Sequence, residues 1–189
     1  MTKTSHGGYV CRNFARRIAG ATGLAVILIC AGSIPFASAV CPNEGRTPSR
    51  LGLQEIHDSL ACLINQERAL NGLSPLAIDG SLHRAAKKHS KTMNRKNFFA
   101  HRGLNGRVRQ AGYCRGAYSW RLGEVIGWGN GSPRWLVSSW MRSPTHREVL
   151  LVPGFLEMGI GVVRGSPLSR KRRPGIAAYT VDFGYRNWR

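Results

Sequence analysis

The stretch Gly159-Ile160-Gly161-Val162-Val163, together with the run 176–183, decides the fold class. The first stretch is short and almost continuously apolar, which is typical of a buried strand. The second alternates Tyr179, Val181 and Phe183 with smaller or polar residues, as expected for a strand with two unlike faces. Because the two stretches follow each other along the chain, they predict a β-hairpin.

Helical patterns precede this hairpin. From Leu53, apolar residues recur at helical spacing until Asn71-Gly72 ends the run. A second amphipathic helix follows, and either Asp79 or Ser81 can cap it. Its apolar side is made of Leu82, Ala85, Ala86, His89 and Met93. Its other side is basic and is expected to face solvent, with Arg84, Lys87, Lys88, Lys91 and Arg95.

The middle of the chain mixes short elements. Residues 97–121 contain several glycines and predict a long connection, and residues 122–128 predict a short strand. Ser132-Pro133 and Ser143-Pro144 each place a cap residue before proline, which predicts two further helix starts. Helices followed by strands and short helices indicate an α+β domain, with helices packed over a mainly antiparallel sheet.

The composition is strongly basic. The chain has 189 residues, with 28 Lys and Arg against 9 Asp and Glu, a formal net charge of +19 and 42% apolar residues. Such a chain can bury a core, which argues for one domain and against a disordered polycation. The charge favours an anionic partner, and the run Arg170-Lys171-Arg172-Arg173 is expected to be exposed. Because the basic residues are not interleaved with stacking aromatics, we expect no specific binding of nucleic acid.

The N-terminus predicts export. Residues 1–39 combine a basic start, a short apolar run and a small-x-small site ending at Ala39, as in a secretory signal peptide. The alternative is a membrane anchor, but the apolar run is shorter than the ~20 residues that a span needs. We therefore expect a lead-in over 40–52 and a domain over 53–189. The processed protein is expected to be secreted, to carry no transmembrane anchor and to be a monomer.

Three cysteines follow the predicted cleavage site, at positions 41, 62 and 114. Outside the cytosol they permit one disulfide and one remaining thiol. A bridge between Cys41 and Cys62 would tie the N-terminal tail to the first helix and leave Cys114 as a buried free thiol. The residues alone leave this pairing open.

Three titratable residues are candidates for chemistry. His101 follows two phenylalanines, Glu124 lies in an otherwise apolar strand, and His146 lies at a helix start. Imidazoles and a carboxylate suit a divalent transition metal, and the same groups could instead transfer protons. The sequence has no P-loop, no Gly-x-Ser-x-Gly elbow and no His-Glu-x-x-His motif, so nucleotide, serine-hydrolase and zincin sites lack local support.

Each candidate also has a structural interpretation. His101 could be a hydrogen-bonded loop residue, His146 could close its helix start, and Glu124 could pair with an arginine. Of the other histidines, His89 is expected in the core, and His57 and His83 are expected on the surface. For the tryptophans Trp120, Trp128, Trp135 and Trp140, core positions are favoured over a groove lining.

Six motifs follow one another along residues 63–184. They are Leu63-Ile64-Asn65-Gln66-Glu67-Arg68-Ala69 with Leu73-Ser74-Pro75-Leu76, Phe98-Phe99-Ala100-His101, Gly123-Glu124-Val125-Ile126-Gly127-Trp128-Gly129, Trp140-Met141-Arg142-Ser143-Pro144-Thr145-His146-Arg147-Glu148-Val149-Leu150, Gly159-Ile160-Gly161-Val162 and Tyr179-Thr180-Val181-Asp182-Phe183-Gly184. In this order they resemble the motifs of the CAP superfamily, which includes the cysteine-rich secretory proteins, antigen 5 and the plant pathogenesis-related proteins. The chain is similar to the bacterial, secreted, single-domain branch, the SCP-like proteins, over about residues 55–185.

The resemblance implies a three-layer α-β-α sandwich with a central cleft. Matched by motif, His101, Glu124 and His146 are the cleft residues that bind zinc in some members. A second family glutamate is replaced by Ser143, and the usual Gly-Glu-Asn has Val125 in its last position. With three ligands, a zinc ion would be weakly held and would keep an open coordination position. Disulfides in secreted members fit the bridge between Cys41 and Cys62.

The resemblance implies binding more than catalysis. Family members are chiefly associated with sterols, fatty acids, glycans or partner proteins. The expected function is therefore binding of a lipid, another amphiphile or an anionic cell-envelope component through a His/Glu-lined cleft that can take up zinc. The alternative is a metal-dependent peptidase or esterase, in which Glu124 acts as the general base for zinc-bound water.

Overall fold

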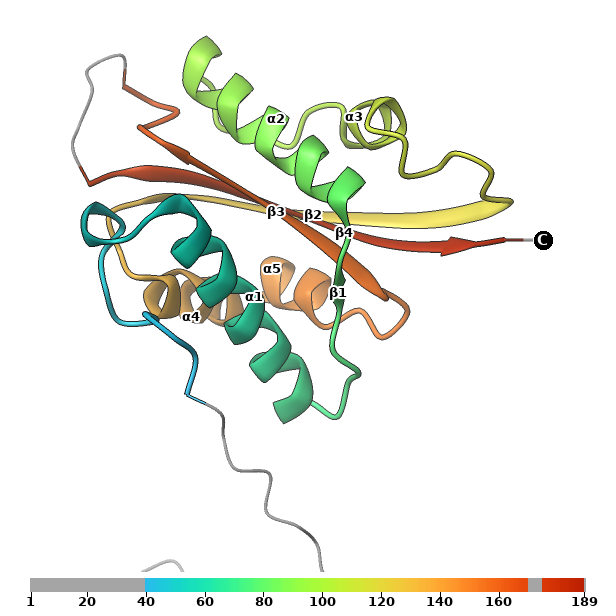
Figure 1. Ribbon diagram of the computed structural model, residues 1–189, viewed down its shortest axis with the longest axis horizontal. Coiled ribbons are helices and arrows are strands. Elements are labelled where there is room, and N and C mark those ends of the chain that lie inside the picture. The colour runs from blue at the N-terminus through green and yellow to red at the C-terminus, as the bar shows by residue number, and fades with distance from the viewer. Residues whose placement is uncertain (1–39, 170–174, 189) are drawn as a thin grey trace, which may run out of the picture. The chain divides into compact units, whose positions relative to one another are not determined.

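The computed structural model describes residues 40–169 and 175–188 (Figure 1). The predicted signal peptide and the basic run 170–173 lie outside the described residues. The elements are η1 (Pro48–Arg50), α1 (Leu53–Leu70), β1 (Ala77–Ile78), α2 (Gly80–Lys96), α3 (Leu104–Gln110), β2 (Ser119–Gly129), α4 (Pro133–Arg142), α5 (Pro144–Leu150), β3 (Glu157–Arg164) and β4 (Ala177–Asn187).

The strands form one sheet in the order β1-β3-β4-β2. β4 pairs antiparallel with β3 and with β2, whereas β1 pairs parallel with β3 over two residues. The predicted hairpin is confirmed as β3 and β4, and the predicted strand over 122–128 is confirmed as the centre of β2. A mainly antiparallel sheet under helices is the α+β architecture that the sequence predicts.

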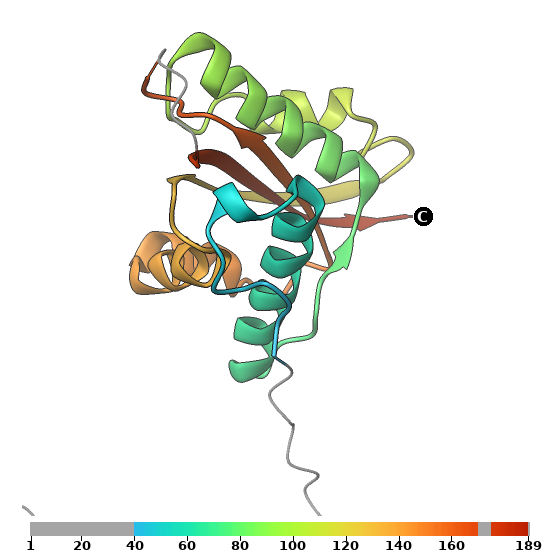
Figure 2. The same ribbon diagram turned by 60° about the vertical axis from the view of Figure 1, so that its left-hand side comes forward.

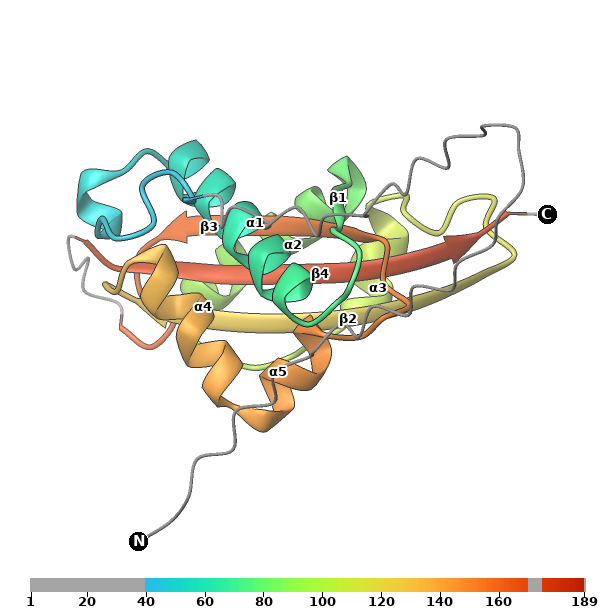
Figure 3. The same cartoon turned by 90° about the horizontal axis from the view of Figure 1, so that it is seen from below.

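The helices form a layer on each face of the sheet, with α2 and α3 on one side and α1, α4 and α5 on the other (Figures 1 to 3). Along β2, the side facing α4 and α5 has glycines, because a Cβ on Gly123 would lie 2.7 Å from the Phe155 ring and one on Gly127 would lie 2.7 Å from Leu136. The alternate residues of β2, Glu124 among them, therefore face α2 and α3. This alternation decides on which side the candidate site lies.

The apolar motif in β3 has its glycines because α2 lies directly on it. A Cβ on Gly159 would lie 2.1 Å from the backbone of Leu82 and His83, and a Cβ on Gly161 would lie 2.2 Å from the backbone nitrogen of Lys87. No side chain fits such distances, so both positions need glycine. In the same layer, the Ser90 hydroxyl of α2 donates to the carbonyl of Gly161 at 3.1 Å. The close approach fixes α2 against the sheet, and with it His89.

On the opposite face, a buried arginine holds two loops to α1. The Arg68 guanidinium donates to the carbonyls of Leu150 and Val152 at 2.9 and 3.0 Å, and its Nε donates to the carbonyl of Ser74 at 3.0 Å. Burial lowers the pKa of Arg68, because its charge is removed from water. The disulfide joins Cys41 to Cys62 in α1 with a Cα separation of 5.7 Å, and Cys114 is a half-buried free thiol.

The helix starts follow the predicted caps in part. Asp79, not Ser81, caps α2, accepting from the backbone nitrogens of Ser81 and Leu82 at 2.8 and 2.9 Å. Ser132 caps α4 by accepting from the Trp135 nitrogen at 3.2 Å. Ser143 directly precedes α5 but does not cap it with its side chain; its hydroxyl lies 2.7 Å from Nδ1 of His146. The basic side of α2 is exposed, as predicted.

Three expectations were wrong. The connection 97–121 contains the helix α3, which its glycines concealed. His57 is buried, because it packs edge-to-face against His83 at 5.5 Å between ring centroids. Of the four tryptophans expected in the core, only Trp140 is buried; exposed are Trp120, Trp128 and Trp135.

Candidate functional site

The site is built on β2, one of the two edge strands of the sheet. Glu124 of β2 is buried, with 2% of its side chain exposed, and its Oε1 lies 2.8 Å from Nδ1 of His101. His101 comes from the segment between α2 and α3 and is 53% exposed. A buried carboxylate thus holds an exposed imidazole through Nδ1–H, which leaves Nε2 of His101 as the lone-pair nitrogen.

Arg107 of α3 occupies the other oxygen of Glu124. Its guanidinium forms an ion pair with Oε2 of Glu124 and lies 3.6 Å from Asp182. Nε2 of His89 lies 3.8 Å from the same Oε2 and 3.1 Å from the carbonyl oxygen of Ala100. Burial lowers the pKa of His89, so the ring is neutral at pH 7 and donates to the carbonyl. Both Glu124 oxygens are therefore engaged by cationic or N–H groups.

Asp182 of β4 is the register partner of Glu124. It is fully buried, and neither of its carboxyl oxygens has a hydrogen-bond partner among the described residues. Burial raises the pKa of Asp182 well above its usual range, and the neighbouring Glu124 carboxylate raises it further, against the opposing effect of Arg107. We therefore describe Asp182 as a protonated carboxyl beside the Glu124 carboxylate that pairs with Arg107.

His146 lies in the first turn of α5, on the other side of the sheet from α3. Its Nδ1 lies 2.7 Å from Oγ of Ser143. Burial lowers the pKa of His146, and the neighbouring His101 lowers it further, so the two imidazoles are within electrostatic range of each other. The structure thus joins His101 to Glu124 directly, and His146 to Ser143.

The arrangement bears on the expected zinc site. Among residues 40–169 and 175–188, no three His, Cys, Asp or Glu side chains are grouped so as to hold a metal ion. The Glu124 carboxylate contacts His101 and Arg107. His101 contacts Glu124, and His146 contacts Ser143, through Nδ1, so Nε2 of each ring is not used in these contacts. The Nε2 atoms of His101 and His146, whose rings are oriented through Nδ1 by Glu124 and Ser143, are nitrogen donors of the kind that zinc prefers, and Glu124 lies behind His101. The three-residue ligand set stays a prediction.

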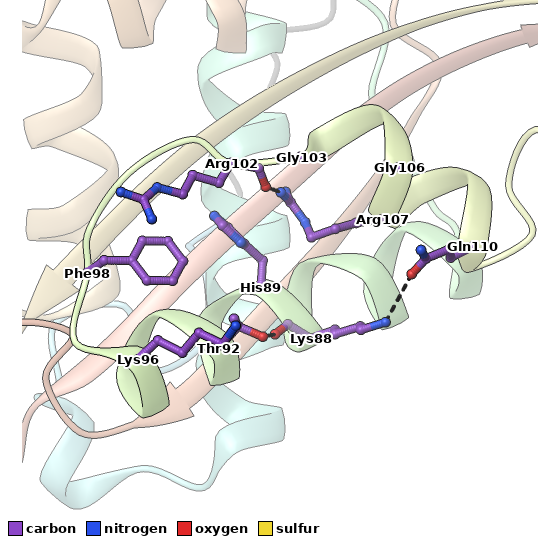
Figure 4. Close-up of a pocket in the computed structure, with 10 residues that line it drawn as sticks. All are labelled: Lys88, His89, Thr92, Lys96, Phe98, Arg102, Gly103, Gly106, Arg107 and Gln110. Carbon is purple, nitrogen blue, oxygen red and sulfur yellow. Dashed lines mark hydrogen bonds between the residues drawn. The ribbon is translucent and has the colours of Figure 1, made fainter.

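A cavity of about 430 Å³ adjoins this site between α2 and α3 (Figure 4). His89 and Arg107 belong both to its lining and to the surroundings of Glu124. None of the three predicted site residues lines it. The rest of the lining consists of Lys88, Thr92, Lys96, Phe98, Arg102, Gly103, Gly106 and Gln110.

Sequence reasoning missed Arg107 and Asp182. Arg107 lies in a segment expected to be a loop, and Asp182 lies in a strand whose alternation identified it only as a residue of the polar face. One available signal was an acidic residue among apolar neighbours in each of two strands, because a buried acid needs a partner. Finding the partner required the register between β2 and β4.

The comparisons with known proteins agree with this architecture. Over 107 residues the chain is 35% identical to the uncharacterized protein YkwD of Bacillus subtilis; the match covers 56% of this chain but only 42% of YkwD. A cysteine-rich secretory protein from Staphylococcus aureus is similar in structure, with a TM-score of 0.56 and 25% identity over 69% of this chain and 38% of that chain.

A second solved structure, that of an outer surface protein of Borrelia burgdorferi, has a TM-score of 0.60 at 21% identity, over 76% of this chain and 99% of that chain, and supports the fold. No helix within the described part of the chain is both long and apolar enough to span a bilayer. Residues 62–183 match the Cysteine-rich secretory protein family, CAP. Because that match covers most of the described domain and the sheet and helices have the same architecture as the solved relatives, the chain belongs to the CAP family, in its bacterial SCP type.

Proposed function

We propose that this protein is an exported binding protein that engages an anionic amphiphile of the bacterial cell envelope, and that His101 and His146 take up zinc. The observation that favours binding over hydrolysis is the engagement of both Glu124 oxygens. A general base must be free to accept a proton from water. The buried Glu124 carboxylate instead accepts a hydrogen bond from His101 and forms an ion pair with Arg107.

The surface on the α2–α3 side supports an amphiphile as the ligand. At one end of the sheet, three aromatic side chains are exposed beside an arginine of α3; together they form the aromatic patch, made of Tyr118, Trp120, Trp188 and Arg109. The Arg109 guanidinium lies 5.8 Å from the centroid of Trp120. Arg186, the register partner of Trp120, lies 5.2 Å from the centroid of Trp188. Aromatic rings beside cations are the residues that proteins place at the headgroup level of membranes.

The charge on the same side supports an anionic ligand. The outer side of α2 carries five exposed basic residues, which are Arg84, Lys87, Lys88, Lys91 and Arg95. A basic surface on the same side of the sheet as exposed tryptophans combines attraction to anionic headgroups with burial of apolar rings. The outer surface protein of Borrelia burgdorferi, which has a similar fold, supports an envelope location.

A zinc ion held by His101 and His146 would supply a Lewis acid with open positions for an oxygen ligand. In the protein itself, Glu124 fixes the His101 ring and Ser143 fixes that of His146. Arg107 pairs with the other oxygen of Glu124 and holds this carboxylate in place, so that the ring orientation persists. These residues position the imidazoles whether or not a metal is bound.

The test is sedimentation with phospholipid vesicles. The purified protein should bind vesicles that contain phosphatidylglycerol and should bind those of phosphatidylcholine alone at least tenfold more weakly. Trp120→Ala/Trp188→Ala should weaken the binding by about tenfold or more, because two exposed rings that would become buried in the bilayer are lost. The matched control is Trp128→Ala, which removes an equally exposed ring from the other end of β2. Equal binding to both vesicle types, or equal loss in the control, would overturn the proposal.

A further inference from the structure

The cavity between α2 and α3 is lined by one face of each helix. Along α3 and its cap, the lining residues have the spacing of one helical side: Gly103, Gly106, Arg107 and Gln110. The lining residues of α2 show the same spacing at Lys88, Thr92 and Lys96. Phe98 and Arg102, from the segment between the helices, close one end, as Figure 4 shows. The cavity is therefore a built feature of the helix pair, and its lining includes no acidic side chain.

The charge in this lining is uncompensated. Of its four Lys and Arg side chains, Arg107 is neutralised by Glu124, which lies behind it. The described residues include no ion pair for the other three, Lys88, Lys96 and Arg102. Lys88 donates only to the neutral Gln110 at 3.1 Å, and the Arg102 guanidinium lies 4.6 Å from the Phe98 centroid. Three cations around about 430 Å³ create a positive potential that an anion would lower.

Arg107 also lacks one hydrogen bond. Its side chain is 11% exposed, and its Nε is buried with no acceptor among the described residues. One terminal nitrogen pairs with Glu124 and the other donates to the carbonyl of Arg102. An unsatisfied N–H of a buried cation is costly, so this atom is prepared for an acceptor that the protein itself does not supply.

Gly106 leaves the middle of the cavity empty. A Cβ at this position would meet no atom within 4 Å, so no close packing requires glycine there. Glycine inside a helix costs stability relative to alanine, by roughly 0.5–1 kcal/mol. Because Gly106 has no side chain, the cavity-facing side of α3 leaves space for a ligand.

We infer that this cavity is a binding site for a phosphate ester, with the phosphate held by Lys88, Lys96, Arg102 and Nε of Arg107. A phosphate group has several charged oxygen atoms, which can accept hydrogen bonds from donors on different sides of a cavity. Guanidinium and ammonium groups are its usual partners. The organic group of the ester would lie against the Phe98 ring. This inference goes beyond the proposed function, because the cavity is separate from the aromatic patch and binding is expected in solution without any vesicle.

The experiment is titration calorimetry of the purified protein with sn-glycerol 3-phosphate at constant ionic strength. Saturable binding of one molecule is expected, and Lys88→Gln/Lys96→Gln should weaken it by about tenfold or more. Lys87→Gln/Lys91→Gln is the matched control, since it removes the same charge from the same helix outside the cavity. Gly106→Leu should block binding without altering charge. On titration, the Nε–H nitrogen resonance of Arg107 should shift in the wild type and stay unchanged in Gly106→Leu.

Three results would overturn the site: no saturation, equal loss in both lysine variants, or full binding by Gly106→Leu. A further arm separates the two sources of the ester. If glycerol 3-phosphate displaces the protein from phosphatidylglycerol vesicles, the site takes the lipid headgroup; if it binds but does not displace, the site takes a soluble ester. Trp120→Ala/Trp188→Ala should lose vesicle binding but should bind glycerol 3-phosphate in calorimetry as the wild type does. The two proposals can therefore fail separately.

Discussion

Glu124 and Asp182 lie directly opposite each other on β2 and β4, as two buried carboxyl groups that face one arginine, Arg107. One cation cannot balance two buried negative charges; burial, and then the neighbouring Glu124, raise the pKa of Asp182, so that its carboxyl keeps a proton in the folded structure. His89 and His101 are the other titratable groups that face Glu124. This relationship makes the site sensitive to pH and to substitution.

Asp182→Asn is expected to flatten the pH dependence of stability. The folded-state pKa of Asp182 lies above that of the unfolded chain, about 3.9. Its contribution is therefore fully present below pH 3.9 and is lost as the pH rises toward the folded-state pKa. The Asn variant resembles the protonated form, so its free energy of unfolding should exceed that of the wild type by an amount that grows from pH 4 to pH 7. Urea unfolding from pH 4 to pH 7 measures these free energies. The same pH dependence in the variant as in the wild type would contradict the prediction.

The same substitution should have the opposite effect when Glu124 is neutral. In Glu124→Gln, Asp182 becomes the remaining acid near Arg107 and is expected to ionise, because an isolated buried cation is costly. Adding Asp182→Asn to Glu124→Gln then removes the last counter-charge and should cost about 3 kcal/mol. A double-mutant cycle in urea at pH 7 checks the reversal. Additive effects would mean that the two carboxyls are independent.

Zinc binding should depend more on the histidines than on Glu124. His101→Ala or His146→Ala should abolish uptake in titration calorimetry, whereas Glu124→Gln should weaken it by about tenfold, as for a residue that orients a ligand. Burial lowers the pKa of His146, so this ring stays neutral, and remains a ligand, to a more acidic pH than an ordinary imidazole does. His83→Ala is the control. Equal loss in Glu124→Gln and His101→Ala would place the carboxylate on the metal.

Arg68→Met should destabilise the domain strongly. The guanidinium binds the carbonyls of Leu150, at the end of α5, and of Val152 just after it, and the substitution leaves these carbonyls buried without donors. A loss of about 3 kcal/mol or more is expected in urea unfolding. Arg142→Met, on the exposed side of α4, should change stability by less than about 0.5 kcal/mol. A similar small change in Arg68→Met would show that the loops hold without it.

Removing the disulfide should also lower stability, through the unfolded state. Cys41 and Cys62 are 21 residues apart, and closing a loop of this size contributes about 3 kcal/mol. Cys41→Ser/Cys62→Ser should therefore unfold at lower urea concentration, and reduction of the wild type should have the same effect. Unfolding at the wild-type concentration of urea would contradict this expectation.

The strands and the long helices could be predicted from the sequence because their signals are local. The alternation around Val181 and the helical spacing after Leu53 each depend on neighbouring residues alone. The glycines of β3 could be recognised only as part of an apolar segment; their reason, the backbone of α2 against Gly159 and Gly161, is a contact between distant segments.

The site could be predicted only in part for the same reason. His101 and Glu124 were identified by family motifs, and the structure brings them into contact. Arg107 was missed because α3 has a glycine at its cap and another inside it, and few apolar residues to mark its period. The exposure of Trp120 depends on its place at the end of an edge strand, which no local pattern encodes.

The most direct test of the central claim is quenching of tryptophan emission by phosphatidylglycerol with brominated acyl chains. If the aromatic patch enters the membrane interface, brominated vesicles should quench the wild type, and Trp120→Phe/Trp188→Phe should lose most of that quenching while Trp128→Phe keeps it. Quenching that is absent in the wild type, or that is unchanged in Trp120→Phe/Trp188→Phe, would contradict the account.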